Sequence, residues 1–291
     1  MSTLKALLGF YRVHRVVFSL VFGVIIIVIL ARGIPDIKYL VCGPLLFTLG
    51  LLSVVGVNNI RDVVADRISK KGEMESFNPL ATGALSVSQA WAAALLPLVM
   101  GIILAAFMNR ETFILFVLFI GFSLFYDLYG KRFVMAPFIS PACLALFMVL
   151  FGFMMDKEGD PVLPYLVLMY YIFMVAGQIG LDILDYEGDK AAGYARLTVV
   201  YGPEKSARVA VALSAALPLL ALLAFVHLDF WWGSLPLIGL ALLQVIPIAR
   251  KYSLYAHNVS QENAKPALSG LMVQYLVIMA AFLAGLLMAR G

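Results

Sequence analysis

The 291-residue chain contains few charged residues: only 13% are Asp, Glu, Lys or Arg, against about 25% in an ordinary soluble domain. Hydrophobic residues make up 63% of the sequence, and the mean hydropathy is +0.97. So few charges cannot cover the surface of a water-soluble fold. The composition therefore excludes a soluble globular enzyme, a disordered chain and a nucleic-acid-binding domain. It indicates a protein whose solvent is a lipid bilayer.

Cysteine and histidine are also scarce. Cys42 and Cys143 both lie in apolar stretches, without the spacing of a metal site or a disulfide framework, which favours a packing role. His14, His227 and His257 are scattered along the chain. The sequence has no His/Cys metal set, no Ser/His/Asp order and neither of the glycine-rich phosphate fingerprints. Any chemistry must therefore depend on other residue types.

Long apolar runs are abundant. Most are long enough for a bilayer-spanning helix, which needs about 20 residues, and lipid leaves no water to satisfy an exposed strand edge. The run at 112–126 is short for a span. The first run follows basic residues, as in a signal peptide, but it is long and lacks a small-residue cleavage site, so we expect a retained helix. We predict an all-α polytopic membrane protein, a single domain over residues 1–291, with nine transmembrane helices. The runs are 16–31, 39–57, 88–108, 112–126, 135–155, 162–181, 208–227, 230–249 and 267–288.

The basic residues predict the orientation. With the N-terminus in the cytoplasm, sixteen of the 21 lysines and arginines fall on the cytoplasmic side and five on the opposite side. This asymmetry follows the positive-inside rule and also accounts for the net charge of +4. We therefore expect an integral protein of the cytoplasmic membrane. The segments after the second and sixth helices are the longest, which is typical of functional loops, and both lie on the cytoplasmic side.

Two acidic clusters begin these long segments. Asn58, Asp62 and Asp66 are spaced i, i+4, i+8, so they share one face of a helix. The second cluster is spaced i, i+3, i+7 and also shares a face; its members are Asp182, Asp185 and Asp189.

Carboxylates this close repel one another, and near lipid they must be paired or bind a metal. Mg²⁺ prefers oxygen ligands and binds through one or two carboxylates together with substrate phosphates. The two clusters therefore favour a Mg²⁺-bound diphosphate over solvated loop acids.

Basic side chains close to the clusters suit an anionic ligand, because they could neutralise a departing diphosphate. Lys131 and Arg132 follow the helix that carries Tyr126, whereas Arg67 follows the first cluster and Lys190 adjoins the second. The positive-inside rule alone also places lysine and arginine in these loops.

These motifs resemble those of the UbiA superfamily of intramembrane prenyltransferases. The first signature is Asn58-x-x-x-Asp62-x-x-x-Asp66 followed by NPLATG at 78–83, and the second is Asp185-x-x-x-Asp189 within DYEGDK at 185–190. The segment from Tyr126 to Arg132 is similar to the Tyr…Lys-Arg segment after the family's fourth helix. With the nine helices, the resemblance covers nearly the whole chain.

The resemblance implies a helical bundle around a central cavity that is capped by the two long loops, with an active site facing the cytoplasm. Mg²⁺ would bind the diphosphate of a polyprenyl donor, the allylic C–O bond would ionise, and a hydrophobic acceptor would capture the cation. The metal-binding residues would be Asn58, Asp62, Asp66, Asp185 and Asp189, with Asp182 matched only in some members. Tyr126 and Lys131 would hold the diphosphate.

One position departs from the family pattern. Many members place arginine immediately before the proline of the first loop, where it can meet the diphosphate, and this chain has Asn78 there. Arg67, Lys70 or Lys71 could substitute for it. The acceptor is therefore left open among a quinone precursor, a glycerol-phosphate lipid and a pigment, as is the oligomeric state.

Two other functions fit parts of the sequence. A terpene cyclase on the same scaffold would ionise the same donor and quench the cation internally, without an acceptor. A membrane transporter would also place acids in a membrane protein, but it is expected to use a site at mid-depth made from broken helices. We see no such site in the sequence.

Overall fold

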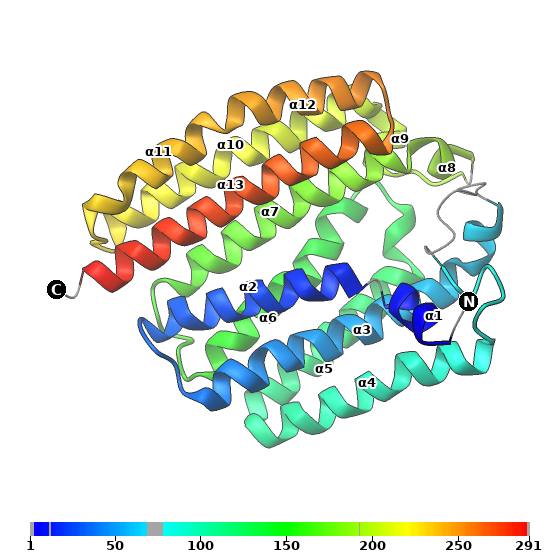
Figure 1. Ribbon diagram of the computed structural model, residues 1–291, viewed down its shortest axis with the longest axis horizontal. Coiled ribbons are helices and arrows are strands. Elements are labelled where there is room, and N and C mark those ends of the chain that lie inside the picture. The colour runs from blue at the N-terminus through cyan, green and yellow to red at the C-terminus, as the bar shows by residue number, and fades with distance from the viewer. Residues whose placement is uncertain (1–2, 12, 69–77, 192, 290–291) are drawn as a thin grey trace.

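The computed structural model describes residues 3–11, 13–68, 78–191 and 193–289, without the side chains of 3–4, 13–19, 64–68 and 131. Within these ranges every regular element is a helix, and the longer helices run side by side in one bundle (Figure 1). The α-helices are α1 (Thr3–Phe10), α2 (Val13–Ala31), α3 (Ile37–Ile68), α4 (Val87–Met108), α5 (Arg110–Leu128), α6 (Ala136–Met154), α7 (Leu163–Leu184), α8 (Tyr186–Ala191), α9 (Leu197–Tyr201), α10 (Pro203–His227), α11 (Leu235–Leu243), α12 (Val245–His257) and α13 (Gln261–Met288), and the short 3₁₀ turns are η1 (Gly130–Arg132) and η2 (Trp232–Ser234).

The predicted all-α membrane fold is confirmed. Eight helical segments in the described part of the chain are long and apolar enough to cross a bilayer, with α11 and α12 counted as one segment. The part of α2 with described side chains, Leu20–Ala31, is a shorter apolar helix that matches the remaining run. The short run at 112–126 lies inside α5, a full-length span. The N-terminal orientation stays a prediction.

Side-chain caps fix the ends of several helices. Ser86 and Gln89 form a reciprocal capping box at the start of α4, since each side chain pairs with the other's backbone N–H. Asn109 alone connects α4 to α5: its Oδ1 accepts from Thr112 N at 2.7 Å, and its Nδ2 donates to the Phe153 carbonyl at 3.0 Å. One residue therefore joins the ends of α4, α5 and α6.

The predicted span at 230–249 is interrupted, which its apolar composition did not indicate. The regular helix breaks at Gln244 between α11 and α12. The cause is Pro247, which has no N–H to offer Leu243. Helical hydrogen bonds continue across the break, from Gln244 N to Leu240 O at 3.0 Å and from Ile248 N to Gln244 O at 3.1 Å. The backbone hydrogen bonds therefore continue on both sides of Gln244 although the regular helix is interrupted there.

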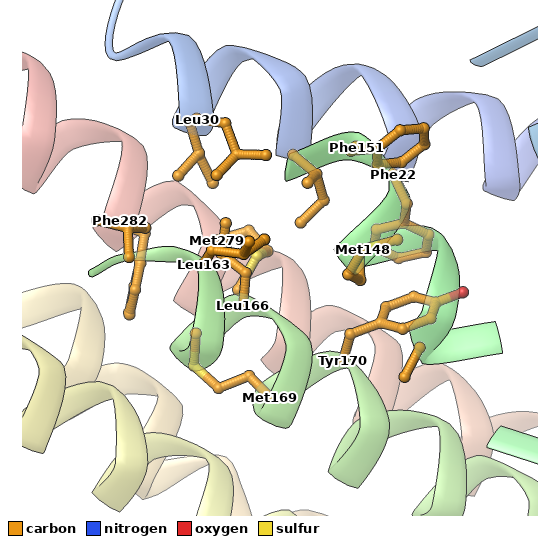
Figure 2. Packing of buried hydrophobic residues seen from close by; sticks show 14 of the residues in the cluster. Phe22, Leu30, Met148, Phe151, Leu163, Leu166, Met169, Tyr170, Met279 and Phe282 are labelled. Atoms are coloured by element: carbon orange, nitrogen blue, oxygen red, sulfur yellow. The ribbon is translucent and has the colours of Figure 1, made fainter. Parts of the chain in front are cut away.

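The largest buried cluster of the described residues packs α2, α6, α7 and α13 against one another. Figure 2 shows side chains of α2, α6, α7 and α13 packed together, including Phe22, Met148, Tyr170 and Met279. The Tyr275 ring stacks on Phe173 at 4.3 Å between centroids. Because lipid tails are as apolar as these side chains, close packing holds the helices together.

Small residues bring α3 against α4. A Cβ built on Gly56 would lie 2.9 Å from the Ala94 Cβ, so a glycine is needed for this approach. Nearby, the Ser53 hydroxyl donates to the Ala94 carbonyl at 3.0 Å. This tight contact lies just before the first acidic cluster and fixes the position of its helix.

The two acidic clusters lie at the same end of the bundle. Figure 1 shows α8 and α9 close to the end of α3, at the end of the bundle where α1 lies, and the last turn of α13 at the opposite end. This arrangement agrees with the prediction that both clusters lie on one side of the membrane.

Candidate active site

The first cluster lies on the last turns of α3. Asn58 and Asp62 are both partly buried, one helical turn apart on this continuous helix. Asn59 between them is fully buried, and its Nδ2 donates to the Phe10 carbonyl at 2.6 Å, which anchors α1 beside the site. The side chains of Asp66 and Arg67 lie outside the described residues.

The second cluster spans the junction of α7 and α8 rather than one helix. α7 ends at Leu184, Asp185 caps it, and Asp189 lies in α8. Helical hydrogen bonds still connect the cluster, because Asp189 N donates to Asp185 O at 2.8 Å. Asp182 and Asp189 are 1% and 8% exposed, whereas Asp185 is half-buried. The predicted common face is thus retained across a break in the helix.

Two tyrosines of α12 hold the end of α7 in place. The Tyr255 hydroxyl donates to the Gly180 carbonyl at 2.8 Å, and the Tyr252 hydroxyl donates to the Ala176 carbonyl at 3.3 Å. Both tyrosines are fully buried. α12 therefore sets the position from which Asp182 projects.

Arg196 pairs with two of the acids. Its Nη1 lies 3.0 Å from Asp182 Oδ1 and 3.2 Å from Asp189 Oδ2, and its side chain is only 12% exposed. Burial alone would lower the pKa of the guanidinium, but Asp182 and Asp189 outweigh this effect and raise its pKa above the ordinary value. Arg196 is therefore a permanent cation within the second cluster.

Asp182 has one satisfied and one unsatisfied oxygen. Gln178 Nε2 donates to Asp182 Oδ1 at 2.8 Å, alongside Arg196. Asp182 Oδ2 is buried and has no hydrogen-bond partner among the described residues. An unsatisfied carboxylate oxygen is costly in a protein interior, so a cationic or donor ligand at this atom would be favourable.

Tyr126 lies within electrostatic range of acids of both clusters. It projects from α5 and is close enough to interact electrostatically with Asp62 of the first cluster and with Asp182 and Arg196 of the second. The buried Asp127 is its neighbour in the chain. Three side chains that the sequence analysis singled out, Asp62, Asp182 and Tyr126, therefore converge in one region.

The basic loop after α5 docks on the loop before α9. Ala195 N donates to the Arg132 carbonyl at 3.1 Å. The Tyr194 ring lies 5.9 Å from the guanidinium carbons of both Arg132 and Arg196. Arg132 is exposed at the edge of the site. The Lys131 side chain lies outside the described residues.

Lys190 forms no ion pair with the acidic clusters among the described side chains. It is exposed, and its ammonium group lies over the ring of Tyr186 at 5.6 Å.

Asn78 has a structural place in its loop. It is 4% exposed, its Nδ2 donates to the Asn59 carbonyl at 2.9 Å, and its Oδ1 accepts from Leu80 N at 3.1 Å. The side chain that replaces the family's arginine therefore ties the first loop to α3.

The donors of this region fit Mg²⁺ in kind. They are carboxylate and amide oxygens, and the buried Asp182 Oδ2 is available. No group of three or more His, Cys, Asp or Glu close enough to share a metal is found among the described side chains, which do not include Asp66. Mg²⁺ commonly uses only one or two protein carboxylates, with water and phosphate as its other ligands.

Arg196 and Gln178 are parts of the site that the sequence motifs did not indicate. Arg196 was counted only among the cytoplasmic charges. Gln178 carried a usable signal: it is a polar residue inside an apolar run, four positions before Asp182 and so on the same helical face.

These features define a class, a helical integral membrane protein whose acidic side chains converge at one end of the bundle. The UbiA prenyltransferase family model matches residues 16–276, and the chain belongs to this family. It is therefore a membrane-bound prenyltransferase, as its sequence motifs predicted.

Known proteins resemble the chain in sequence and in fold. The digeranylgeranylglyceryl phosphate synthase of Pyrococcus furiosus is 28% identical over 207 residues, 71% of this chain and 72% of that protein. The apo structure of a UbiA homologue from Aeropyrum pernix K1 aligns with a TM-score of 0.75 at 16% identity, over 92% and 98% of the two chains. A UbiA homologue from Archaeoglobus fulgidus bound to GPP and Mg²⁺ aligns with a TM-score of 0.67 at 22% identity, over 97% and 99%. At these identities the structures establish a shared fold.

Proposed function

We propose that the chain transfers a polyprenyl group from a polyprenyl diphosphate to a glycerol-phosphate lipid in a Mg²⁺-dependent reaction. The observation that carries the proposal is that Tyr126 lies within electrostatic range of both clusters, of Asp62 in the first and of Asp182 in the second. The similarity to digeranylgeranylglyceryl phosphate synthases supports the acceptor class, because a product with two prenyl groups is formed by prenylating a glyceryl phosphate that already carries one. The related structure bound to GPP and Mg²⁺ supports the donor and the metal.

In this proposal the metal ligands are drawn from Asn58, Asp62, Asp66, Asp182, Asp185 and Asp189. Bound Mg²⁺ supplies positive charge that stabilises the leaving diphosphate. Tyr126, Lys131 and Arg132 hold the diphosphate, and Arg67 and Lys190 add positive charge at the mouth of the site. The N-terminus and the site face the cytoplasm, as the distribution of basic residues predicts.

The proposed reaction breaks the allylic C–O bond, and its electron pair leaves with the diphosphate. A hydroxyl oxygen of the acceptor forms the new C–O bond and releases its proton to water or to the departing diphosphate. The chain's residues orient the diphosphate, and the apolar bundle excludes water that would otherwise capture the cation.

The test uses purified protein, Mg²⁺ and geranylgeranyl diphosphate with a panel of acceptors, and it measures diphosphate release and products by mass spectrometry. We expect geranylgeranylglyceryl phosphate to be prenylated and an aromatic quinone precursor to be left unchanged. Prenylation of the aromatic acceptor alone would overturn the acceptor assignment. A cyclic terpene formed from the donor without any acceptor would establish the cyclase function instead.

A further inference from the structure

Arg196 occupies a position that the proposed function leaves unexplained. A single guanidinium nitrogen, Nη1, contacts both Asp182 and Asp189, at 3.0 and 3.2 Å. These two acids are the most deeply buried members of the second cluster. Arg196 is thus a buried cation that compensates both of them.

The surroundings of Arg196 hold it in this position. It directly precedes α9, and its carbonyl accepts from Val199 N and Val200 N at 3.0 and 2.9 Å. Tyr194 packs against its guanidinium, and the neighbouring Ala195 is bonded to the loop after α5. A side chain so constrained loses little conformational entropy when it pairs with the acids.

A divalent cation would be attracted by the same carboxylates. Two carboxylates and one guanidinium carry a net charge of −1, whereas the acids without Arg196 would carry −2. The electrostatic attraction for Mg²⁺ is therefore weaker while Arg196 remains paired. Buried charges left uncompensated are strongly destabilising, so the pairing also stabilises the metal-free protein.

We propose that Arg196 is a positioning residue that acts as a resident counter-cation: it holds Asp182 and Asp189 in place before the metal arrives and competes with the metal for them. The proposal rests on the proposed function for the presence of Mg²⁺ in the site. It predicts that Arg196 sets the Mg²⁺ concentration at which the site fills.

The test measures the melting temperature of the full-length protein in detergent, in EDTA and across a MgCl₂ titration with inorganic pyrophosphate. We expect Arg196→Gln to melt several degrees lower than the wild type in EDTA. We also expect it to reach half-saturation at a Mg²⁺ concentration lower by on the order of tenfold, because one competing charge is gone. Arg196→Lys should lie near the wild type. Arg250→Gln, which removes an exposed arginine, is the matched control.

Equal destabilisation of Arg196→Gln with and without Mg²⁺, at an unchanged half-saturating concentration, would show a merely structural role and overturn the proposal. If Arg196→Gln does not fold, the double variant Asp182→Asn with Arg196→Gln removes both charges of the buried pair together. It should still bind Mg²⁺ more tightly than Asp182→Asn alone, and weaker or equal binding would overturn the proposal.

The wild-type protein separates this proposal from the proposed function. Mg²⁺-dependent stabilisation and prenyl transfer in the wild type, with no altered Mg²⁺ response in Arg196→Gln, would overturn only the role of Arg196. A wild type with neither property would overturn both.

Discussion

The backbone N–H of Ala195 donates to the carbonyl oxygen of Arg132 at 3.1 Å and so joins two loops that are far apart in the sequence. One loop follows α5, which carries Tyr126, and the other contains Arg196. The bond, together with the Tyr194 ring, which lies 5.9 Å from both guanidinium groups, places the basic loop beside the second acidic cluster. The site is therefore assembled from loop contacts as much as from helices.

Asp62→Ala and Asp185→Ala should each reduce prenyl transfer by on the order of 100-fold, because each removes a carboxylate proposed to bind the metal. The measurement is kcat/KM for the donor at saturating acceptor. Glu158→Ala, an exposed acid outside the site, is the control and should remain fully active. Full activity in both aspartate variants would show that the roles are wrongly assigned.

Tyr126→Phe should raise KM for the donor or lower kcat, for a total loss of about tenfold, because a hydrogen bond to a charged group contributes about 1.5 kcal/mol or more. The ring and its packing are retained, so the melting temperature should not change. Tyr129→Phe is the matched control, because Tyr129 is 60% exposed. A variant that loses stability but no activity would assign Tyr126 to packing.

Removal of divalent cations with EDTA should abolish prenyl transfer, and MgCl₂ should restore it. The physical reason is that the departing diphosphate lacks sufficient positive charge from the protein alone. Diphosphate release assayed before and after chelation, with donor and acceptor held constant, measures the effect. Undiminished turnover in EDTA would contradict the Mg²⁺ dependence.

Asn78→Arg restores the residue that many family members carry, but here it should destabilise the protein. The change breaks two buried hydrogen bonds, to Asn59 and from Leu80, and leaves their partners unsatisfied at a cost of about 1–3 kcal/mol. The shift in melting temperature measures the loss. A stable variant with a lower KM for the donor would show instead that the loop accepts the arginine.

Gly56→Ala should also destabilise the protein, by about 1–3 kcal/mol, because the added Cβ meets the backbone of Ala94 at 3.1 Å. Gly121→Ala is the matched control, since a Cβ there meets nothing within 4 Å and alanine favours a helix. Melting temperatures of both variants measure the difference. Equal stability would show that α3 and α4 separate easily.

The helices could be predicted from the sequence because span length and apolar composition are local properties. The run at 112–126 became α5, and both acidic clusters begin where predicted, at the ends of spans. The pairing of Asp182 with Arg196 could not be predicted, because it depends on the path of the loop between them. The buried hydrogen bonds of Asn78 could not be predicted either, since they depend on how its loop packs against α3.

The break near Pro247 and the end of α7 at Leu184 are intermediate cases. Proline is visible in the sequence, but several spans contain one, and the sequence does not show which will interrupt the regular helix. The spacing of Asp185 and Asp189 suits a continuous helix. In the structure α7 ends at Leu184, before Asp185, but the helical hydrogen bond from Asp189 N to Asp185 O is still formed.

The single residue between α4 and α5 also determines how α5 is rotated about its own axis. Asn109 is the C-cap of α4 and the N-cap of α5, and its side chain is hydrogen-bonded to the end of α6, so the turn contains no additional residue that could absorb an insertion. One residue inserted there would turn everything that follows in α5 by about 100°. Tyr126 would then point to a different neighbour, although it lies more than four helical turns from the insertion.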